Sequence, residues 1–385
     1  MKKTILISTV ILISIVSNLF AVVETNDIKR TSAPNGSLLL EYKLFDTVAS
    51  EFFAGPTTII DKKGVKIVDL VRIEGLSNYH SVYFDGKLLL IETKDGLLAG
   101  QIKVISFKVG KKGLKKLNEI VFDDAKYAHA FGELIVVTLS PGGATDIIVY
   151  NNKLSKKLFE IPSSDADVHK TYPNGVVSQS QDIGGHKEVT YTKKGKPLSQ
   201  HSIPIPAEGD LKYRYDDKGG LLYWIETGSG GNYTNSPITY VDKKGKKILD
   251  NAVLDGIPVY WYEYGWNTKY LYLKVPVQSK ILVYKIGKNT VKVNESDAAP
   301  VNDLTLEKSK VYVVSKEPGG DMKVTEYDKN MEKEKWDSPY YNNVDYVSKG
   351  VFQGTDRQTS GTGKDITVTI FKGTKNIAVH NYYEP

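Results

Sequence analysis

Two short stretches decide the fold of this chain: Gly219-Gly220-Leu221-Leu222-Tyr223-Trp224 and, further along, Thr239-Tyr240-Val241-Asp242-Lys243-Lys244-Gly245-Lys246. The first is a turn followed by a short β-prone apolar run, and the second is an alternating strand that ends in a basic turn. Stretches of both kinds recur from one end of the chain to the other, at a period of roughly 44 residues. We therefore expect a protein built from repeated β-rich units.

The copies of the two stretches alternate along the sequence. Copies of the first begin at Asn35, Asp85, Gly132, Asn174, Gly219, Lys269, Lys310 and Lys349. Copies of the second end in turns at residues 61–64, 110–113, 151–153, 193–196, 242–246, 285–288, 328–329 and 372–373. Each unit also has room for one strand before the first stretch and one after the second. Four short strands per unit are typical of a β-propeller blade.

The sequence thus predicts an all-β protein with a single β-propeller domain, residues 24–385, made of eight four-stranded blades. Seven blades are the alternative, because the first inner strand (residues 23–30) is polar and no C-terminal strand obviously completes the first blade. A pair of β-sandwiches would not keep one period throughout, and a β-solenoid repeat is usually shorter. The best helical stretch, residues 108–118, is interrupted by glycines.

Composition narrows the possible functions. The chain has 385 residues, 41% of them hydrophobic and 25% charged, which is enough to bury a sizeable core. It contains no Cys, which excludes disulfides, thiolate-ligated metals and a thiol nucleophile. The formal net charge of +6 is too mild and too evenly spread to indicate nucleic-acid binding.

The first 21 residues have the pattern of a secretory signal peptide. Lys2 and Lys3 precede an apolar run over residues 4–16, and Ala21 offers a cleavage site. The run is short for a transmembrane span and charged residues follow it. We therefore expect a bacterial protein that is periplasmic or secreted, with no membrane span after cleavage.

A propeller has two faces, and the repeat assigns a different set of connections to each. The bottom face carries the turns between strands one and two and between strands three and four of each blade. The top face carries the remaining loops. The Lys-rich turns therefore crowd the bottom face, where they serve as ordinary hairpin turns or support peripheral contact with an anionic lipid or polysaccharide surface.

The histidines offer a candidate metal site. His80, His129 and His169 fall on the predicted inner strands of three successive blades, so that all three can face the centre of the ring. Imidazoles in this arrangement suit a divalent transition metal, with a carboxylate such as Asp124, Asp165 or Asp167 completing the shell. The same groups could act as general acid and base, or simply fill a wet channel. His201 and His380 are expected to be peripheral.

Aromatic side chains offer a candidate binding site on the top face. Tyr260, Trp261 and Tyr262 open the sixth unit, and Tyr213, Arg214 and Tyr215 open the fifth. Aromatics at these entries can stack on sugar rings or peptide side chains. Because side chains alternate along a strand, some of them must instead pack between blades.

The third-strand pattern, seen in Tyr240-Val241-Asp242-Lys243-Lys244-Gly245-Lys246, resembles that of exported bacterial β-propellers of the PQQ-like and YVTN-like repeat superfamily. The resemblance covers nearly all of the mature chain and implies a fold but no particular activity. The signatures of WD40, kelch and quinoprotein dehydrogenase propellers are missing.

Two functions follow as predictions. The first is an exported, non-catalytic propeller that binds a protein or glycan partner on its top face, through Tyr260, Trp261, Tyr262, Tyr213, Arg214 and Tyr215. The alternative is a metal-assisted polysaccharide lyase or hydrolase that uses His80, His129 and His169. A structural envelope component, with neither ligand nor activity, is a third possibility. Whether the chain is an enzyme stays open at this point.

Overall fold

The computed structural model describes residues 23–46, 51–76, 79–131, 134–140, 146–161, 168–172, 175–182, 185–203, 210–216, 218–226, 237–254, 264–267, 269–275, 280–287, 289–297, 301–307, 309–361 and 363–384. The predicted signal peptide, residues 1–21, lies outside them. These residues form eight four-stranded antiparallel sheets, which we number in chain order. Eight sheets agree with the expected eight units rather than with seven.

The first four sheets use the first sixteen strands in order. Sheet 1 consists of β1 (Val23–Ser32), β2 (Leu38–Asp46), β3 (Glu51–Ile60) and β4 (Lys66–Val71). Sheet 2 consists of β5 (Tyr79–Phe84), β6 (Leu88–Thr93), β7 (Ile102–Gly110) and β8 (Gly113–Phe122). Sheet 3 consists of β9 (Ala125–Phe131), β10 (Leu134–Leu139), β11 (Asp146–Asn151) and β12 (Lys157–Ile161). Sheet 4 consists of β13 (Val168–Tyr172), β14 (Gly175–Asp182), β15 (Gly185–Thr192) and β16 (Pro197–Ile203).

The remaining four sheets repeat the pattern. Sheet 5 consists of β17 (Asp210–Tyr215), β18 (Leu221–Glu226), β19 (Ile238–Val241) and β20 (Lys247–Ala252). Sheet 6 consists of β21 (Tyr264–Asn267), β22 (Tyr270–Val275), β23 (Lys280–Lys285) and β24 (Val291–Asp297). Sheet 7 consists of β25 (Val301–Glu307), β26 (Lys310–Lys316), β27 (Met322–Asp328) and β28 (Glu334–Asp337). Sheet 8 consists of β29 (Asn343–Ser348), β30 (Val351–Ser360), β31 (Gly363–Lys372) and β32 (Lys375–Glu384).

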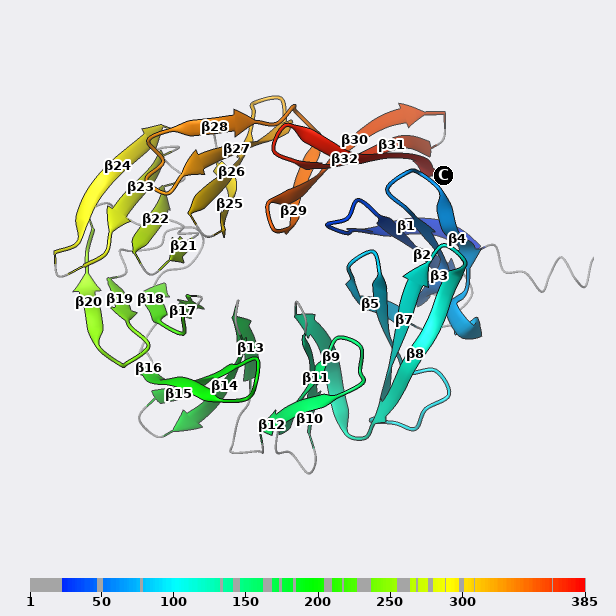
Figure 1. Ribbon diagram of the computed structural model, residues 1–385, viewed down its shortest axis with the longest axis horizontal. Helices are drawn as coiled ribbons and strands as arrows, with labels where there is room; N and C mark the ends of the chain where they lie inside the picture. The colour runs from blue at the N-terminus through cyan, green and yellow to red at the C-terminus, as the bar shows by residue number, and fades with distance from the viewer. Residues whose placement is uncertain are drawn as a thin grey trace, which may run out of the picture.

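The sheets follow one another in a ring, with the first strand of each nearest the centre (Figure 1). This is the arrangement of a β-propeller. The stretch at residues 108–118, the best helical candidate, is the hairpin between β7 and β8, and its glycines stand at the two ends of the turn. The polar first strand forms nonetheless, because its Ile28 is buried together with Leu38 and Leu40 of β2 against sheet 8.

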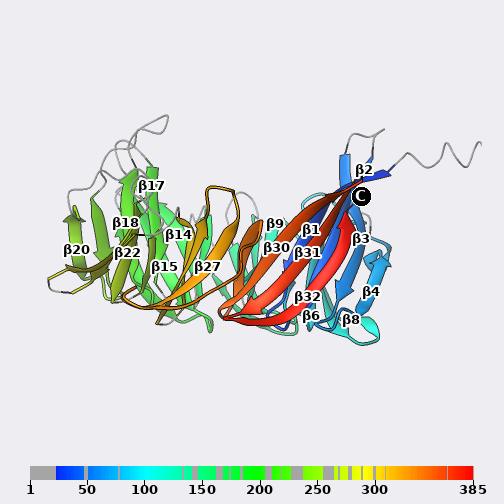
Figure 2. The same ribbon diagram turned by 90° about the horizontal axis from the view of Figure 1, so that it is seen from above.

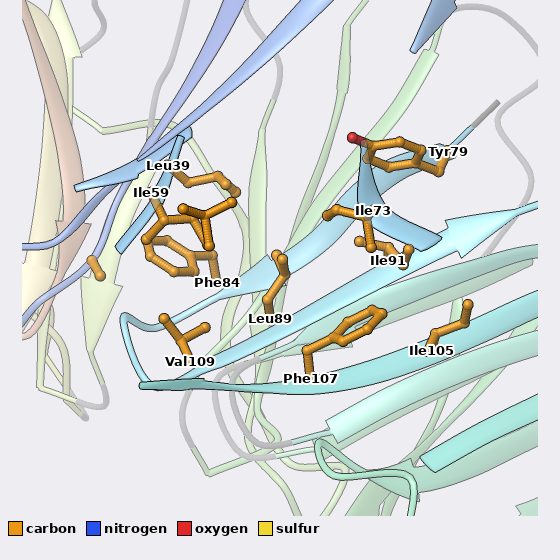
Figure 3. Close-up of a cluster of buried hydrophobic side chains, with 12 residues drawn as sticks. Leu39, Ile59, Ile73, Tyr79, Phe84, Leu89, Ile91, Ile105, Phe107 and Val109 are labelled. Carbon is orange, nitrogen blue, oxygen red and sulfur yellow. The ribbon is translucent and has the colours of Figure 1, made fainter. Parts of the chain in front are cut away.

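The core of the protein lies between the sheets. In the cluster between sheets 1 and 2, Leu39 and Ile59 pack against Phe84, Leu89 and Phe107 (Figure 3). Similar clusters join sheets 2 and 3, 3 and 4, 5 and 6, 6 and 7, and 7 and 8. The apolar runs of the second strands are therefore buried on both faces, which explains why they are nearly continuous.

The last sheet packs against the first. Leu38 and Leu40 lie in one cluster with Val368 and Ile370. The Ser32 hydroxyl donates a hydrogen bond of 2.6 Å to the Gln353 side chain. Further out, the Arg30 guanidinium lies within hydrogen-bond distance of the Tyr382 hydroxyl and pairs with the Glu384 carboxylate. Side-chain contacts join the two ends of the chain, since each sheet consists of four consecutive strands and no strand crosses from one to the other.

Some local details repeat at a longer interval of four sheets. Leu70 in sheet 1 and Asn251 in sheet 5 both have positive φ angles, 48° and 46°. Their backbone N–H groups donate to the hydroxyl oxygens of Thr58 and Thr239, at 3.1 and 3.2 Å.

Sheets 2 and 6 share another such detail. The side-chain amides of Asn118 and Asn294 donate to the Lys153 and Asn330 carbonyls of the following sheets, at 2.9 and 3.0 Å. The residues after these carbonyls, Leu154 and Met331, are both buried and both have φ of 56°. The two halves of the ring therefore share these local contacts.

Among the described residues, no helix is long and apolar enough to span a bilayer.

Candidate functional site

The three candidate metal ligands lie on the inner strands of successive sheets, as predicted. His80 is in β5, His129 in β9 and His169 in β13. The first two side chains are exposed, and that of His80 keeps 58% of its surface accessible. The His169 side chain lies outside the described residues. The strand positions thus agree with the prediction, while metal binding by the three imidazoles remains a prediction.

The carboxylate nearest His80 already holds two sheets together. The Glu92 carboxylate, 4.0 Å from the His80 ring nitrogen, is buried and accepts the backbone N–H of Ala128 at 2.8 Å. In the same way, Glu41 of sheet 1 accepts the backbone N–H of Ser81 at 2.7 Å. Each glutamate lies on the second strand of its sheet and accepts a backbone N–H from the inner strand of the next sheet. These hydrogen bonds join neighbouring sheets.

The described part of the chain contains no group of three or more His, Cys, Asp or Glu side chains placed to hold a metal. Of the carboxylates that the sequence offered to complete a metal shell, Asp124 is exposed, whereas Asp165 and Asp167 lie outside the described residues. Nothing in the described residues brings Asp124 to the histidines.

The aromatic candidates fall into two groups. Tyr260, Trp261 and Tyr262 lie outside the described residues, so their role remains a prediction. Tyr213 and Tyr215 are partly buried in β17, with ring centroids 6.1 Å apart, and the Tyr215 ring lies 6.2 Å from His201 of sheet 4.

Their environment is that of an interface between sheets. Burial, followed by the charge of nearby Glu188, raises the pKa of the Tyr213 hydroxyl well above its usual value. Glu188 also belongs to sheet 4. Arg214, which lies between the two tyrosines in the strand, is exposed. The two tyrosines therefore pack against sheet 4, and of this trio Arg214 is the side chain that is open to a partner.

A large cavity lies on the bottom face, where three inner strands end. Its volume is about 1110 Å³. It is lined by residues between Arg30 and Asn35, between Tyr83 and Lys87, and between Asp345 and Lys349, with Gln353, Asn152 and Lys193. We call it the mouth cavity. Sheets 8, 1 and 2 supply most of its wall, and the third-to-fourth-strand turns of sheets 3 and 4 supply Asn152 and Lys193.

The carboxylates of the mouth cavity are held by the protein itself. Asp85 accepts the backbone N–H groups of Lys87 and Leu88 at 2.8 and 2.7 Å, and the Tyr83 hydroxyl at 3.2 Å. Asp345 accepts the side-chain amide of Asn343 at 2.8 Å. These contacts fix the ends of two inner strands and set the shape of the wall.

Other lining groups face the cavity with donors and rings. Lys87 and Lys349 are exposed, and Asn152 and Lys193 are partly exposed. The Tyr346 ring packs edge-on against Phe352, with centroids 5.3 Å apart, and burial raises the pKa of its hydroxyl. The cavity thus combines two tyrosine side chains, Tyr83 and Tyr346, with amide and ammonium donors.

Sequence reasoning missed this cavity. Asn35, Asp85 and Lys349 stand in turns that repeat along the chain and have the composition of ordinary hairpins. The signal that was available is their shared position, because each follows an inner strand and so lies at the same end of the ring.

No family model and no curated protein matches the sequence. Among solved structures, a eukaryotic initiation factor shares 13% identity over 93% of this chain and 90% of that one, with a TM-score of 0.50. The β-propeller domain of the Trilobed protease from Pyrococcus furiosus shares 10% identity over 84% of this chain and 98% of that one, with a TM-score of 0.40. A prolyl endopeptidase shares 13% identity over 90% of this chain and 52% of that one, with a TM-score of 0.43. Likeness at this level concerns the fold and not the function.

Proposed function

We propose that the chain is an exported, non-catalytic, eight-bladed β-propeller that binds a glycan in the mouth cavity. The observation that carries the proposal is this cavity of about 1110 Å³, with its tyrosines, amides and lysines on a rigid frame. Sites for small ligands are concave and hold a few fixed polar groups among apolar and aromatic ones. The mouth cavity meets that description and is large enough for several sugar rings.

The chemistry of the lining suits a polyhydroxylated ligand. The Asn35 and Asn152 amides can each donate and accept hydrogen bonds, as sugar hydroxyls do. Tyr83 lines the same cavity, and the face of an aromatic ring packs well on the apolar face of a sugar. Lys87 and Lys193 add positive charge, which favours a glycan that carries carboxylates, sulfates or phosphates.

The hydrogen bonds of the two carboxylates in the cavity, Asp85 and Asp345, favour binding without catalysis. A general acid or base needs a group free to take up and release a proton. Asp85 uses one oxygen for two backbone N–H groups, and Asp345 accepts from amide side chains, so both act as structural acceptors. We therefore assign recognition, and no reaction, to this cavity.

The proposal moves the ligand from the top face, where the sequence suggested it, to the bottom face. A protein partner at Tyr260, Trp261 and Tyr262 remains a separate prediction, since those residues are not described. Export rests on the pattern of residues 1–21 alone. Mass spectrometry of the protein recovered outside the cytoplasm tests it, because cleavage after Ala21 gives a defined N-terminus.

A glycan array tests the function. We expect the wild-type protein to bind a small set of glycans, and the double variant Lys87→Ala with Asn152→Ala to lose most of that signal. The control is Lys243→Ala with Asn289→Ala, which removes the same side-chain types from bottom-face turns outside the cavity. Array binding that survives the first pair, or is lost with the second, contradicts the assignment to the cavity.

The metal-assisted lyase or hydrolase is retained as a second candidate for one reason. His80 and His129 are both exposed on adjacent inner strands, as that function requires.

A further inference from the structure

We propose that the bottom face docks the protein on an anionic lipid bilayer. The inference goes beyond the glycan proposal and does not depend on it.

Every connection between a third and a fourth strand carries an exposed lysine in the turn or directly beside it. The eight examples, one for each sheet, are Lys62, Lys111, Lys153, Lys194, Lys243, Lys285, Lys329 and Lys372. The turns between first and second strands add exposed lysines in five sheets, namely Lys87, Lys218, Lys269, Lys310 and Lys349. Positive charge therefore surrounds the whole face rather than one corner of it.

Many of these lysines are free to meet an external anion. Within the described part of the chain, seven turn lysines form no ion pair: Lys62, Lys63, Lys111, Lys112, Lys194, Lys243 and Lys244. The nearby aspartates instead accept hydrogen bonds from backbone N–H groups of their own turns. Asp61 accepts the backbone N–H groups of Lys63 and Val65, and Asp242 accepts those of Lys244 and Lys246, all at 2.8 to 2.9 Å.

The opposite face carries charges of both signs. Asp123 and Asp124 lie between β8 and β9, and Glu317 and Asp321 lie between β26 and β27. Asp123, Asp124 and Asp321 are exposed. Exposed lysines also lie near this face, namely Lys94, Lys126, Lys316 and Lys364, so its charge is mixed, whereas the bottom face repeats an exposed lysine in every sheet. An anionic surface therefore attracts the bottom face more strongly.

The shape of the face favours a planar partner. Seen from the side, the turns β7–β8 and β31–β32 both reach the lower edge of the ring (Figure 2). Turns spread around a ring can engage many headgroups of a bilayer at once, whereas a single linear polymer would follow only part of the ring. Lysine is a compact, flexible, strongly hydrated point charge, suited to a diffuse anionic surface rather than to one bidentate ligand.

Docking in this orientation turns the mouth cavity toward the headgroups. A glycan presented at the membrane would then meet the cavity directly. The two proposals can still be separated by experiment, because lipids without sugar test docking alone.

The experiment is co-sedimentation of the mature protein with vesicles. One set is phosphatidylcholine alone, and in the other phosphatidylserine replaces a third of it. We expect binding to the anionic vesicles only, and loss of that binding when salt rises from about 0.1 M to about 1 M, where the screening length falls from about 10 Å to about 3 Å.

Charge reversal locates the surface. The bottom-face variant carries Lys63→Glu, Lys112→Glu, Lys194→Glu and Lys244→Glu. Its affinity for anionic vesicles should fall at least about a hundredfold. The control variant makes the same change in net charge near the top face, with Lys94→Glu, Lys126→Glu, Lys316→Glu and Lys364→Glu, all exposed. It should retain most of the binding. Circular dichroism melting curves confirm that both variants fold.

Three results would overturn the proposal. One is equal loss in the two variants, which would show an effect of net charge alone. Another is equal binding to both vesicle types. The third is a wild-type protein that binds soluble dextran sulfate but no vesicles, together with a bottom-face variant that no longer binds dextran sulfate. That result would assign the face to an anionic polymer.

Discussion

His201 and His380 lie four sheets apart and make the same contact. Each is buried in the fourth strand of its sheet, with Nε2 2.9 Å from the carbonyl oxygen of a glycine in the next sheet, Gly219 for His201 and Gly36 for His380. The Nδ1 atoms of both rings are buried and have no hydrogen-bond partner among the described residues. The pair joins sheet 4 to sheet 5 and sheet 8 to sheet 1, which are the two boundaries between the halves of the ring.

This pair predicts that acid weakens the fold. Burial lowers the pKa of both imidazoles. The hydrogen bond to the glycine carbonyl, followed by the charge of nearby aspartates, opposes this effect only in part. The folded protein therefore binds these protons less readily than the unfolded chain. The stabilisation is complete above the unfolded histidine pKa of about 6.5 and is lost as the pH falls below it. For each histidine, a tenfold difference in proton affinity between the folded and unfolded states corresponds to about 1.4 kcal/mol.

Urea unfolding between neutral and mildly acidic pH measures this loss. The variant His201→Gln with His380→Gln should be less stable at neutral pH and should show a flatter dependence on pH. His80→Gln is the control, because the His80 side chain is exposed. A double variant with the same pH slope as the wild type would show that other groups cause the acid sensitivity.

The contact between the first and last sheets predicts a second effect. Arg30 lies beside the Tyr382 hydroxyl and pairs with Glu384, and both members of the ion pair are largely buried. Arg30→Met should leave a buried carboxylate without its partner and lower the free energy of unfolding by about 2 kcal/mol. Lys116→Met, which breaks more exposed ion pairs with Glu74 and Glu119, should cost less than about 1 kcal/mol. Equal urea midpoints for the two variants would contradict this role of Arg30.

The positive φ angles of Leu70 and Asn251, which lie four sheets apart, predict a substitution that raises the free energy of unfolding. Leu70 has φ of 48° and is 57% exposed, so it gains little from burial while its branched side chain is strained. Leu70→Gly should raise the free energy of unfolding by up to about 1 kcal/mol. Asn251→Gly should change it by no more than a few tenths of a kcal/mol, because asparagine tolerates this conformation. Thermal melts of the two variants compare them, and a destabilised Leu70→Gly would refute the argument.

The inner-strand histidines predict a test of the lyase alternative. Elemental analysis of protein purified without chelator should show no stoichiometric Zn or Mn if the chain only binds glycans, and added metal should not raise the melting temperature. A bound metal that disappears in His129→Ala would instead support a centre made by His80, His129 and His169.

How much the sequence could predict depends on whether a feature is local. The repeated turns mark every unit separately, so the number of sheets and the inner-strand positions of His80, His129 and His169 follow from pattern alone. His201 and His380 lie away from the centre of the ring, as expected, but their burial was not predicted. Their strands are the outermost of their sheets, but a turn of the next sheet covers each of them, and that contact depends on how neighbouring sheets pack.

The full wall of the mouth cavity was missed because it depends on how the sheets pack. Arg30, Tyr83 and Asp345 come from three sheets at both ends of the chain, and only the closure of sheet 8 on sheet 1 brings them to one wall. Tyr213 and Tyr215 were expected at the entry to an inner strand, but they lie at the end of β17 (Asp210–Tyr215). The neighbours against which they pack belong to sheet 4, which the local sequence does not reveal.

A crystal structure of the protein with a glycan selected on the array tests the central claim most directly. Our account predicts ligand density in the mouth cavity, against Tyr83 and within hydrogen-bond distance of Asn152 or Lys87. Density confined to the top face, beside Trp261, with an unoccupied mouth cavity would contradict it.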